Sequence, residues 1–249
     1  MKIKVINLRK INIFRSKSTI IVVIIVLFSL ICGSLSKVYR NNIALDAVET
    51  ISDEKIIILD AGHGGEDVGA TGVNGIFEKD LNLQVTMSIG EILSEKGYTV
   101  VYTRTEDKLL YKSEENIKGL RKISDLKNRC KVAKEYPNAI FVSIHMNSFG
   151  EQKYSGLQVY YSAINEESIK LADSIQSNVK NTLQPNNNRK TKNGKGIYLL
   201  EHIDNISVLI ECGFLSNPEE SEKLSQKEYQ KNLSFSIVCG IIEYMNIKT

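Results

Sequence analysis

Two histidines and two glutamates stand where an α/β protein places reactive groups. His63 follows the apolar run 55–59, and His145 ends the apolar run 139–145. Glu211 ends a third apolar run, 206–211, and Glu78 begins a stretch with helical spacing. Two histidines and one carboxylate form a common catalytic zinc set with a position open for water, and a further carboxylate can act as general base and acid. The pattern favours a metal hydrolase.

Each of these residues also has a purely structural interpretation. His63 could be a hydrogen-bonding residue of the glycine-rich turn, and His145 could be a core histidine with satisfied nitrogens. Glu78 could be a first-turn acid that meets the helix dipole. Glu211 is the hardest to explain in this way, because a carboxylate that emerges from a buried strand needs a cation or a metal nearby.

Other chemistries fit the sequence less well. The glycines at 62–65 resemble the oxyanion-hole stretch of some lipases, but no Gly-x-Ser-x-Gly turn supplies a nucleophile, and the phosphate-loop pattern is absent. Cys212 could be a thiol nucleophile with His145 or His202 as its base. The simpler interpretation makes Cys212 a small buried hydrophobe and places His202 on the surface, at most as a substrate contact.

The elements that must position these residues alternate between strands and helices. Apolar and β-branched runs predict strands at 55–59, 98–103, 139–145, 156–162 and 206–211, with a short extended segment at 197–200. Helical spacing predicts helices over 78–96, 124–135, 166–183 and 219–245, the last with a break near Ser225. The alternation predicts an α/β single domain with a mainly parallel central sheet, covered by helices on both faces. Reactive groups then gather at the carboxyl ends of the strands.

The first 54 residues differ in composition from the rest. Residues 1–17 hold six basic side chains and no acid, and 18–36 carry no charge. We expect a basic cytoplasmic tail, then a transmembrane signal-anchor or signal peptide at 18–36, and a linker over 37–54. The positive charges should stay in the cytoplasm, so the catalytic domain at 55–249 should be extracytoplasmic, either membrane-anchored or secreted.

Charge and cysteine content exclude several classes of protein. Removing the six basic residues of the tail from the chain's 32 leaves 26 against 29 acidic residues, so the domain has no basic excess to bind nucleic acid. Four scattered cysteines without a Cys-x-x-Cys pair exclude a disulfide scaffold and a zinc ribbon.

Four stretches together resemble the zinc-dependent N-acetylmuramoyl-L-alanine amidases of the amidase-3 family, in that family's order: 58–65, 77–83, 143–148 and 209–218. The resemblance implies that His63, Glu78 and His145 bind one Zn²⁺. It implies that Glu211 is the general base and acid in hydrolysis of the amide between the lactyl group of N-acetylmuramic acid and L-alanine. Asn147 and Arg104 are candidate substrate-binding residues.

Two residues depart from the family's pattern. Ala61 stands where the family usually has proline, and Cys212 stands where an apolar residue is usual. Neither departure removes a ligand or the acid. We expect Ala61 to loosen the loop that aims His63, and we expect the irregular stretch 107–120 to be able to act as a flap.

The resemblance extends to a branch of the family. The anchor-like start, the lack of a separate wall-binding domain and residues 196–200 point to the germination-specific, spore-cortex branch. That branch implies action around the forespore cortex, a downstream muramic acid deacetylase that forms muramic-δ-lactam, and an accessory lipoprotein as a further candidate partner. Two alternatives stay open: a catalytically idle peptidoglycan-binding module, and a zinc peptidase that cuts within the stem peptide.

Overall fold

The computed structural model describes residues 21, 55–111, 114, 117 and 120–247. The predicted tail at 1–17, membrane segment at 18–36 and linker at 37–54 lie outside these residues, apart from Ile21, as does part of the predicted flap at 107–120. No helix in the described ranges combines the length and the apolar character that crossing a membrane requires.

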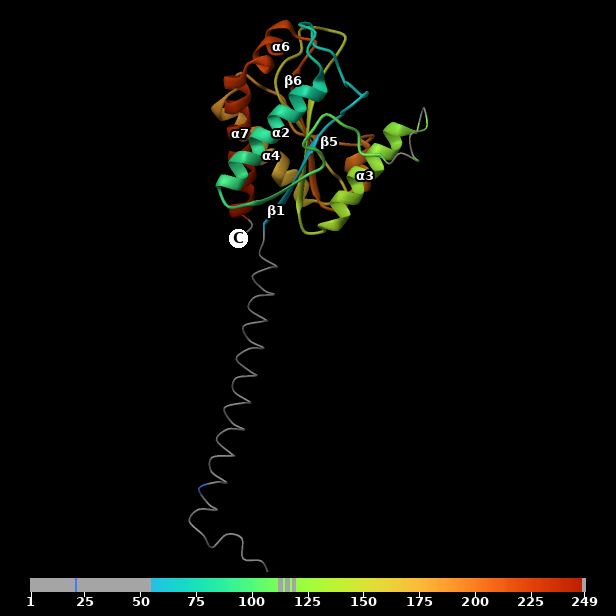
Figure 1. Ribbon diagram of the computed structural model, residues 1–249. Helices are drawn as coiled ribbons and strands as arrows, with labels where there is room; N and C mark the ends of the chain where they lie inside the picture. Colours follow the sequence, from blue (N-terminus) through green and yellow to red (C-terminus); the bar gives the residue numbers. More distant parts are fainter. Residues whose placement is uncertain (1–20, 22–54, 112–113, 115–116, 118–119, 248–249) are drawn as a thin grey trace, which may run out of the picture. The chain divides into compact units, whose positions relative to one another are not determined.

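A mixed sheet forms the centre of the domain (Figure 1). In spatial order its strands within 55–247 are β2 (Thr99–Tyr102), β1 (Ile56–Ala61), β3 (Ile140–Asn147), β6 (Ile206–Phe214), β4 (Gln158–Tyr161) and β5 (Lys192–Asn193). The first four pair in parallel, whereas β4 runs antiparallel to β6 and parallel to β5. The parallel half confirms the expected sheet, and the reversed pair β4–β5 makes it mixed.

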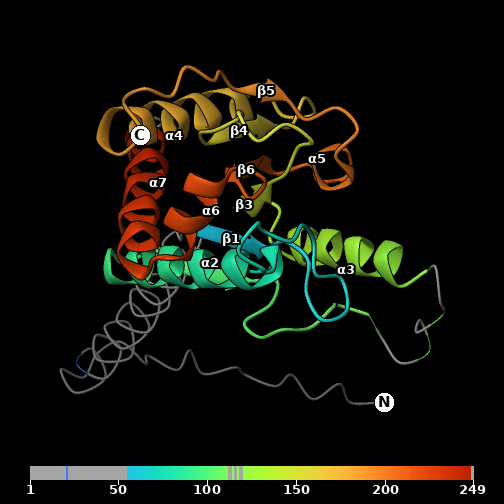
Figure 2. The same ribbon diagram turned by 90° about the horizontal axis from the view of Figure 1, so that it is seen from above.

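Helices cover both faces of this sheet, as predicted (Figure 2). Successive strand residues point to opposite faces, so Ile57 and Leu59 of β1 enter one core and Ile58 enters the other. The larger core packs against α2 (Glu78–Glu95), α4 (Glu167–Thr182) and α7 (Lys227–Ile247). The smaller core packs against α3 (Arg121–Glu135) and α5 (Tyr198–His202).

Two predicted helix ends are confirmed. Helix α2 is followed by Gly97, whose φ of +85° suits a glycine at a helix C-terminus. The break near Ser225 separates α6 (Pro218–Ser225) from α7. Helix α6 begins at a capped terminus, because the side chain of Asn217 accepts hydrogen bonds from the backbone nitrogens of Glu219 and Glu220.

The short segment at 197–200 was predicted to be extended, and this prediction is wrong. It begins the helix α5, in which Leu199 and Leu200 are 4% and 1% exposed. A run of four apolar residues has no period that separates strand from helix, so packing decides its conformation. The two-residue strand β5, within the polar stretch after α4, had no hydrophobic signal.

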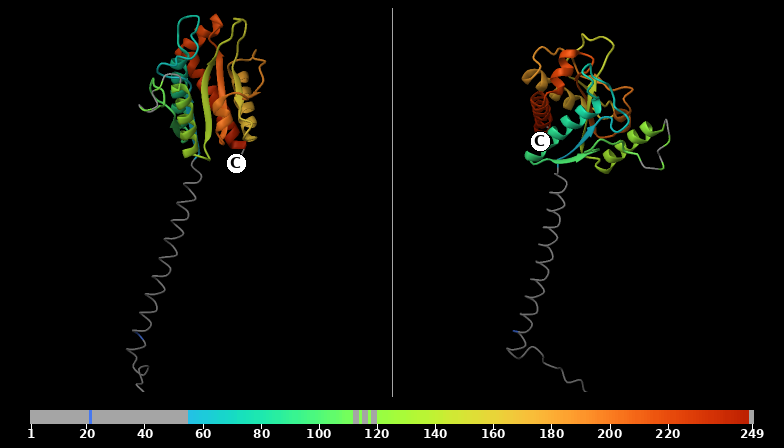
Figure 3. Two further views of the ribbon diagram at one scale, coloured as in Figure 1. Left: turned by 90° about the vertical axis from the view of Figure 1, so that its right-hand side faces the viewer. Right: turned by 45° about the horizontal axis from the view of Figure 1, so that its top comes forward.

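The two longest strands, β3 and β6, run side by side through the domain (Figure 3). Their register pairs Ile144 with Ile210 and His145 with Glu211. Both polar residues therefore emerge at the same carboxyl edge of the sheet.

Candidate metal centre

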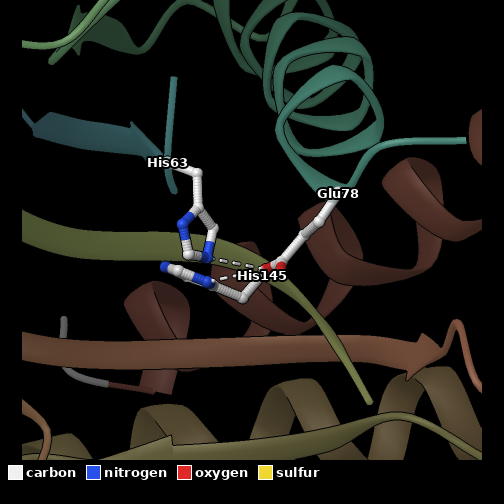
Figure 4. Close-up of side chains that lie close together, drawn as sticks. All are labelled: His63, Glu78 and His145. Atoms are coloured by element: carbon white, nitrogen blue, oxygen red, sulfur yellow. Dashed lines mark hydrogen bonds and ion pairs between the residues drawn. The ribbon is translucent and has the colours of Figure 1, made fainter. Parts of the chain in front are cut away.

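Three of the predicted residues converge at this edge (Figure 4). One ligand atom from each of His63, Glu78 and His145 lies within 4.8 Å of the others. Oε1 of Glu78 lies 3.2 Å from Nε2 of His63 and 2.9 Å from Nδ1 of His145. Two imidazole nitrogens and one carboxylate, gathered this closely, fit the protein ligands of a catalytic zinc ion.

His63 is held in an unusual backbone conformation. Its φ is +61°. Among the described residues, His63 is the one non-glycine residue with a positive φ. Histidine tolerates this left-handed region better than most side chains, at a cost of about 1–3 kcal/mol. The surrounding structure must therefore hold the loop in place.

Two buried arginines hold it. The carbonyl of Ala61 accepts hydrogen bonds from Nε of Arg104 (2.9 Å) and from a terminal nitrogen of Arg129 (2.7 Å). The carbonyl of Gly62 accepts one from Arg104 (3.0 Å), and that of His63 accepts one from Arg129 (2.8 Å). Three successive carbonyls are thus fixed by charged donors, which make stronger hydrogen bonds than neutral ones.

Arg104, a candidate substrate contact in the sequence, is 2% exposed. Its other hydrogen bonds also go to backbone carbonyls, those of Lys79 and Glu106. Its guanidinium therefore supports the loop that carries His63. Both arginines also donate hydrogen bonds to the carbonyl of Ala61, so they help to fix the loop at the position where the family usually has proline.

Arg129 is itself fixed by two carboxylates. Its Nη1 lies 2.6 Å from Oδ1 of Asp60, and its Nε lies 2.7 Å from Oδ2 of Asp125. All three residues are buried. Burial alone would raise the pKa of Asp60, but the charge of Arg129 and hydrogen bonds from Ser143, Thr103 and Arg129 together lower that pKa. Sequence reasoning missed this group. Two features of the sequence could have revealed it: an aspartate, Asp60, inside a buried strand, and Asp125 and Arg129 four residues apart on one helix.

Glycines make room for the ligands. A Cβ atom on Gly62 would lie 2.2 Å from Nε2 of His145, and one on Gly69 would lie 2.5 Å from Oε2 of Glu78. No real Cβ atom approaches another heavy atom so closely. The glycine-rich loop therefore wraps directly around two of the three candidate ligands.

The far side of His63 faces a carboxylate that the sequence did not identify. Nδ1 of His63 lies 3.0 Å from Oδ2 of Asp67, a charge contact rather than an aligned hydrogen bond. Such a carboxylate orients a metal-binding imidazole and makes it more basic. Burial would lower the pKa of His63, but Asp67 and Glu78 together raise it to about 9.

Glu78 is anchored from several sides. It is 4% exposed, and its carboxylate accepts hydrogen bonds from the backbone nitrogens of Ala70 (2.8 Å) and Met146 (3.1 Å). Burial would raise the pKa of Glu78, but hydrogen bonds with His145 and His63 hold it well below its usual range. The carboxylate is thus ionised and fixed, as a metal ligand should be.

Glu211 differs from Glu78 in having no such support. Its Oε2 atom is buried and has no hydrogen-bond partner among the described residues. Burial raises the pKa of Glu211 to about 7, against the attraction of His145, which lowers it. A carboxyl group with a pKa near neutrality can accept a proton in one step and return it in the next.

The remaining candidates lie around this centre. Asn147 ends β3, after an irregularity in register that follows His145, and it lines a hollow together with Tyr160 and Phe214. Cys212 is fully buried, which raises its pKa well above the usual value and confirms its interpretation as a small buried hydrophobe. His202 is exposed and stacks on the ring of Tyr198 at 3.9 Å, away from the ligand group.

Comparison with known proteins agrees with this site. Residues 57–243 match the family model described as N-acetylmuramoyl-L-alanine amidase. The germination-specific N-acetylmuramoyl-L-alanine amidase of Bacillus subtilis is 40% identical over 196 residues, which span 78% of this chain and 81% of that protein.

Solved structures show the same fold. The CwlD amidase of Clostridioides difficile, in complex with the GerS lipoprotein, has a TM-score of 0.75 and 40% identity, covering 78% of this chain and 99% of that one. The amidase AmiC2 of Nostoc punctiforme has a TM-score of 0.67 and 28% identity, covering 78% and 98%. The protein therefore belongs to the amidase-3 family of N-acetylmuramoyl-L-alanine amidases, enzymes that act on peptidoglycan.

Proposed function

We propose that this amidase works with one Zn²⁺ held by His63, Glu78 and His145, with Glu211 as general base and acid, and that its substrate is the peptidoglycan of the spore cortex. The observation that carries the proposal is a complete zinc donor set together with Glu211, whose buried Oε2 has no hydrogen-bond partner among the described residues. The bond cleaved is the amide between the lactyl group of N-acetylmuramic acid and L-alanine.

The donor chemistry fits zinc. Two imidazoles and one carboxylate would leave the fourth coordination position of a zinc ion open for water or substrate. Zinc held by these three residues would supply Lewis-acid chemistry that acidifies water and polarises a carbonyl. Asp67 orients His63 from behind, and the backbone nitrogens of Ala70 and Met146 orient Glu78. These contacts fix the ligands before the metal arrives, which lowers the cost of binding it.

Glu211 would move the proton. In its ionised form, the unpartnered Oε2 takes a proton from the attacking water as the carbon–oxygen bond forms. The same oxygen then donates this proton to the nitrogen of L-alanine as the carbon–nitrogen bond breaks, so that a neutral amine leaves. A pKa of about 7 places both forms of Glu211 within reach at neutral pH.

The cortex role rests on the relative from Bacillus subtilis, whose described role is germination-specific. Removal of a peptide stem leaves a bare muramic acid, which a muramic acid deacetylase could then convert to muramic-δ-lactam. The substrate lies outside the cytoplasm, so the domain would act there, tethered or released according to the fate of residues 18–36. By analogy with the CwlD–GerS complex, an accessory lipoprotein is a candidate partner.

Complementation tests the cortex role. A Bacillus subtilis strain without its germination-specific amidase would express this chain, with and without a co-expressed accessory lipoprotein. Mass spectrometry of spore peptidoglycan would measure muramic-δ-lactam. We expect the wild-type chain and the His202→Ala variant to restore the lactam and His63→Ala to fail. A wild-type chain that is exported, releases stems from vegetative peptidoglycan and still leaves the cortex without lactam would refute the cortex role.

A further inference from the structure

The hollow that Asn147 lines opens beside the metal centre, at the carboxyl edge of β3 and β6. It has a volume of about 320 Å³, and the residues that matter here are Asn147, Gln158, Tyr160, Arg189, Lys192 and Phe214. Gln158 of β4 is the register partner of Glu211 on β6. Asn147 lies two residues beyond His145 on β3. We call this hollow the Arg189 pocket.

Arg189 is held firmly by neutral groups. Its Nε donates a hydrogen bond to the carbonyl of Ser155 (2.7 Å), and Nη1 donates one to Oε1 of Gln158 (3.3 Å). Its Cζ lies 4.4 Å from the centre of the Phe214 ring, a cation–π contact. The guanidinium is therefore positioned in advance, and none of these contacts is an ion pair.

Glu220 is an acid whose charge interacts with Arg189, but its oxygens accept hydrogen bonds from the backbone nitrogens of Gly156 and Phe214. Among the described residues, Arg189 forms no ion pair with a carboxylate, and none of the residues that line the pocket is acidic. Lys192 adds a second, exposed cation. A guanidinium has five N–H donors in a planar fork that matches a carboxylate, and the bonds above engage two of its three nitrogens. The pocket is therefore complementary to an anion.

The pocket is electrostatically close to the proton carrier. Burial raises the pKa of Tyr160, the charge of Glu211 raises it further, and Arg189 lowers it. The phenol of Tyr160 therefore interacts with the charges of both Glu211 and Arg189. Partners on neighbouring antiparallel strands lie about 5 Å apart, so the pocket begins within about one or two residues' length of extended chain from Glu211.

We propose that the Arg189 pocket binds a free carboxylate of the peptide stem, on the residue that follows L-alanine. Glycan strands of repeating N-acetylated sugars offer mainly neutral hydroxyl and amide groups, whereas stem peptides carry carboxylates. Glutamate at the second stem position is joined through its side chain, which leaves its α-carboxylate free. The proposal rests on the amidase activity and adds to it a selectivity for unamidated stems.

Two substrates of nearly equal shape isolate this carboxylate. N-acetylmuramoyl-L-alanyl-γ-D-glutamyl-L-lysine carries it, and the corresponding compound with D-isoglutamine at the second position carries an amide in its place. We would measure kcat/KM of the zinc-loaded full-length chain on both. We expect the wild-type chain to favour the acid by about tenfold, the scale of one charge-assisted hydrogen bond. In Arg189→Gln the ratio should fall to near one, and in Arg189→Lys it should be intermediate.

Lys153→Gln is the matched control. The Lys153 side chain is 68% exposed, pairs with Glu151 and does not line the Arg189 pocket. We expect it to keep the acid-to-amide ratio of the wild-type chain. Thermal unfolding of each variant would show whether it is folded, and Lys192→Gln gives a second, exposed position at which the ratio should fall.

The inference is overturned if the wild-type chain cleaves both compounds equally, or if folded Arg189→Gln keeps the wild-type ratio while slowing both reactions. In either case the role of Arg189 would be limited to stabilising the segment before β4, through its hydrogen bond to the carbonyl of Ser155. Calorimetric binding of the two free tripeptides, L-alanyl-γ-D-glutamyl-L-lysine and its D-isoglutamine counterpart, gives the same ratio without turnover. Equal binding of both by the wild-type chain would also overturn the inference, whereas selective binding without cleavage would instead place the fault in the proposed reaction.

Discussion

His145 on β3 and Glu211 on β6 are partners in a parallel register, and both end up at one edge of the sheet. This pairing places a candidate metal ligand beside the candidate proton carrier with no loop between them. A rigid sheet therefore sets the spacing of the two groups. The glycine-rich loop after β1 and the start of α2 bring His63 and Glu78 to the same point.

Replacement of a candidate ligand should remove zinc. We expect His63→Ala to lower zinc affinity by more than about a hundredfold, because loss of a direct ligand exceeds the usual effect of losing its supporting contacts. Competition with a chromophoric chelator would measure it. His202→Ala is the matched control, since this histidine is exposed and stacks on Tyr198. Equal zinc binding by both variants would remove His63 from the ligand set.

Replacement of Glu211 should stop turnover and leave zinc in place. Loss of a general base and acid typically costs about 10²–10⁴ in rate. We expect Glu211→Gln to lose activity within or beyond this range, measured as stem release from peptidoglycan, while it binds zinc as the wild-type chain does. Wild-type rates in Glu211→Gln would rule out its role as proton carrier.

Glu211→Gln should make the metal-free protein more stable than the wild-type chain at a pH above the raised pKa of Glu211. The pKa of Glu211 is raised from 4.5 to about 7, so between these values the folded state holds a proton that the unfolded state has lost. Stability therefore falls as the pH rises through this window. Above it, Glu211→Gln should be more stable by up to about 3 kcal/mol. Denaturant unfolding at about pH 8 and about pH 4 checks this, and a difference that grows toward acid would contradict it.

Loss of Arg129 should weaken both the fold and the metal site. Removing one partner of a buried ion pair costs about 3–5 kcal/mol, and Arg129→Met would leave Asp60 and Asp125 without their cation. It would also free the carbonyl of His63, so zinc affinity should fall.

The control for Arg129 lies on the same helix. Arg121 pairs with Glu66, but its side chain is 30% exposed, against 2% for Arg129. Arg121→Met should cost about 1 kcal/mol or less. Urea unfolding compares the two variants, and equal losses would show that the buried group contributes no more than a surface pair.

A methyl group on Gly62 should displace His145. The new Cβ would lie 2.2 Å from Nε2 of His145, so either the ring or the loop must move. We expect Gly62→Ala to lower zinc affinity by at least about tenfold. Gly150→Ala is the control, because nothing lies within 4 Å of its added Cβ. Wild-type zinc affinity in Gly62→Ala would mean that His145 has room to rearrange.

The sequence was informative where the signal is local. Buried strands are continuous apolar runs, so the polar residue that interrupts one is visible without a structure, as His145 and Glu211 were, although β3 continues to Asn147 and β6 to Phe214. Helix ends carry their own marks, as Gly97 shows at the end of α2. Asn217, which caps the start of α6, carried such a mark that was not recognised in the sequence.

Long-range contacts were beyond reach. The direction of β4 depends on its pairing with β6, which comes about fifty residues later in the chain. Arg104 and Arg129 could not be connected to the carbonyls of the His63 loop, because those contacts span between 42 and 68 positions. Arg104 had the charge of a substrate contact, and only its burial revealed a different set of partners.

Analysis of the released fragments tests the central claim most directly. The zinc-loaded full-length chain would be incubated with intact peptidoglycan, beside a chelated sample and the Glu211→Gln variant, and the products identified by mass spectrometry. We predict peptides that begin with a free L-alanine amine, released by the zinc-loaded wild-type chain and absent from both controls. Fragments with new ends inside the stem, or release that survives chelation, would contradict a zinc-dependent amidase.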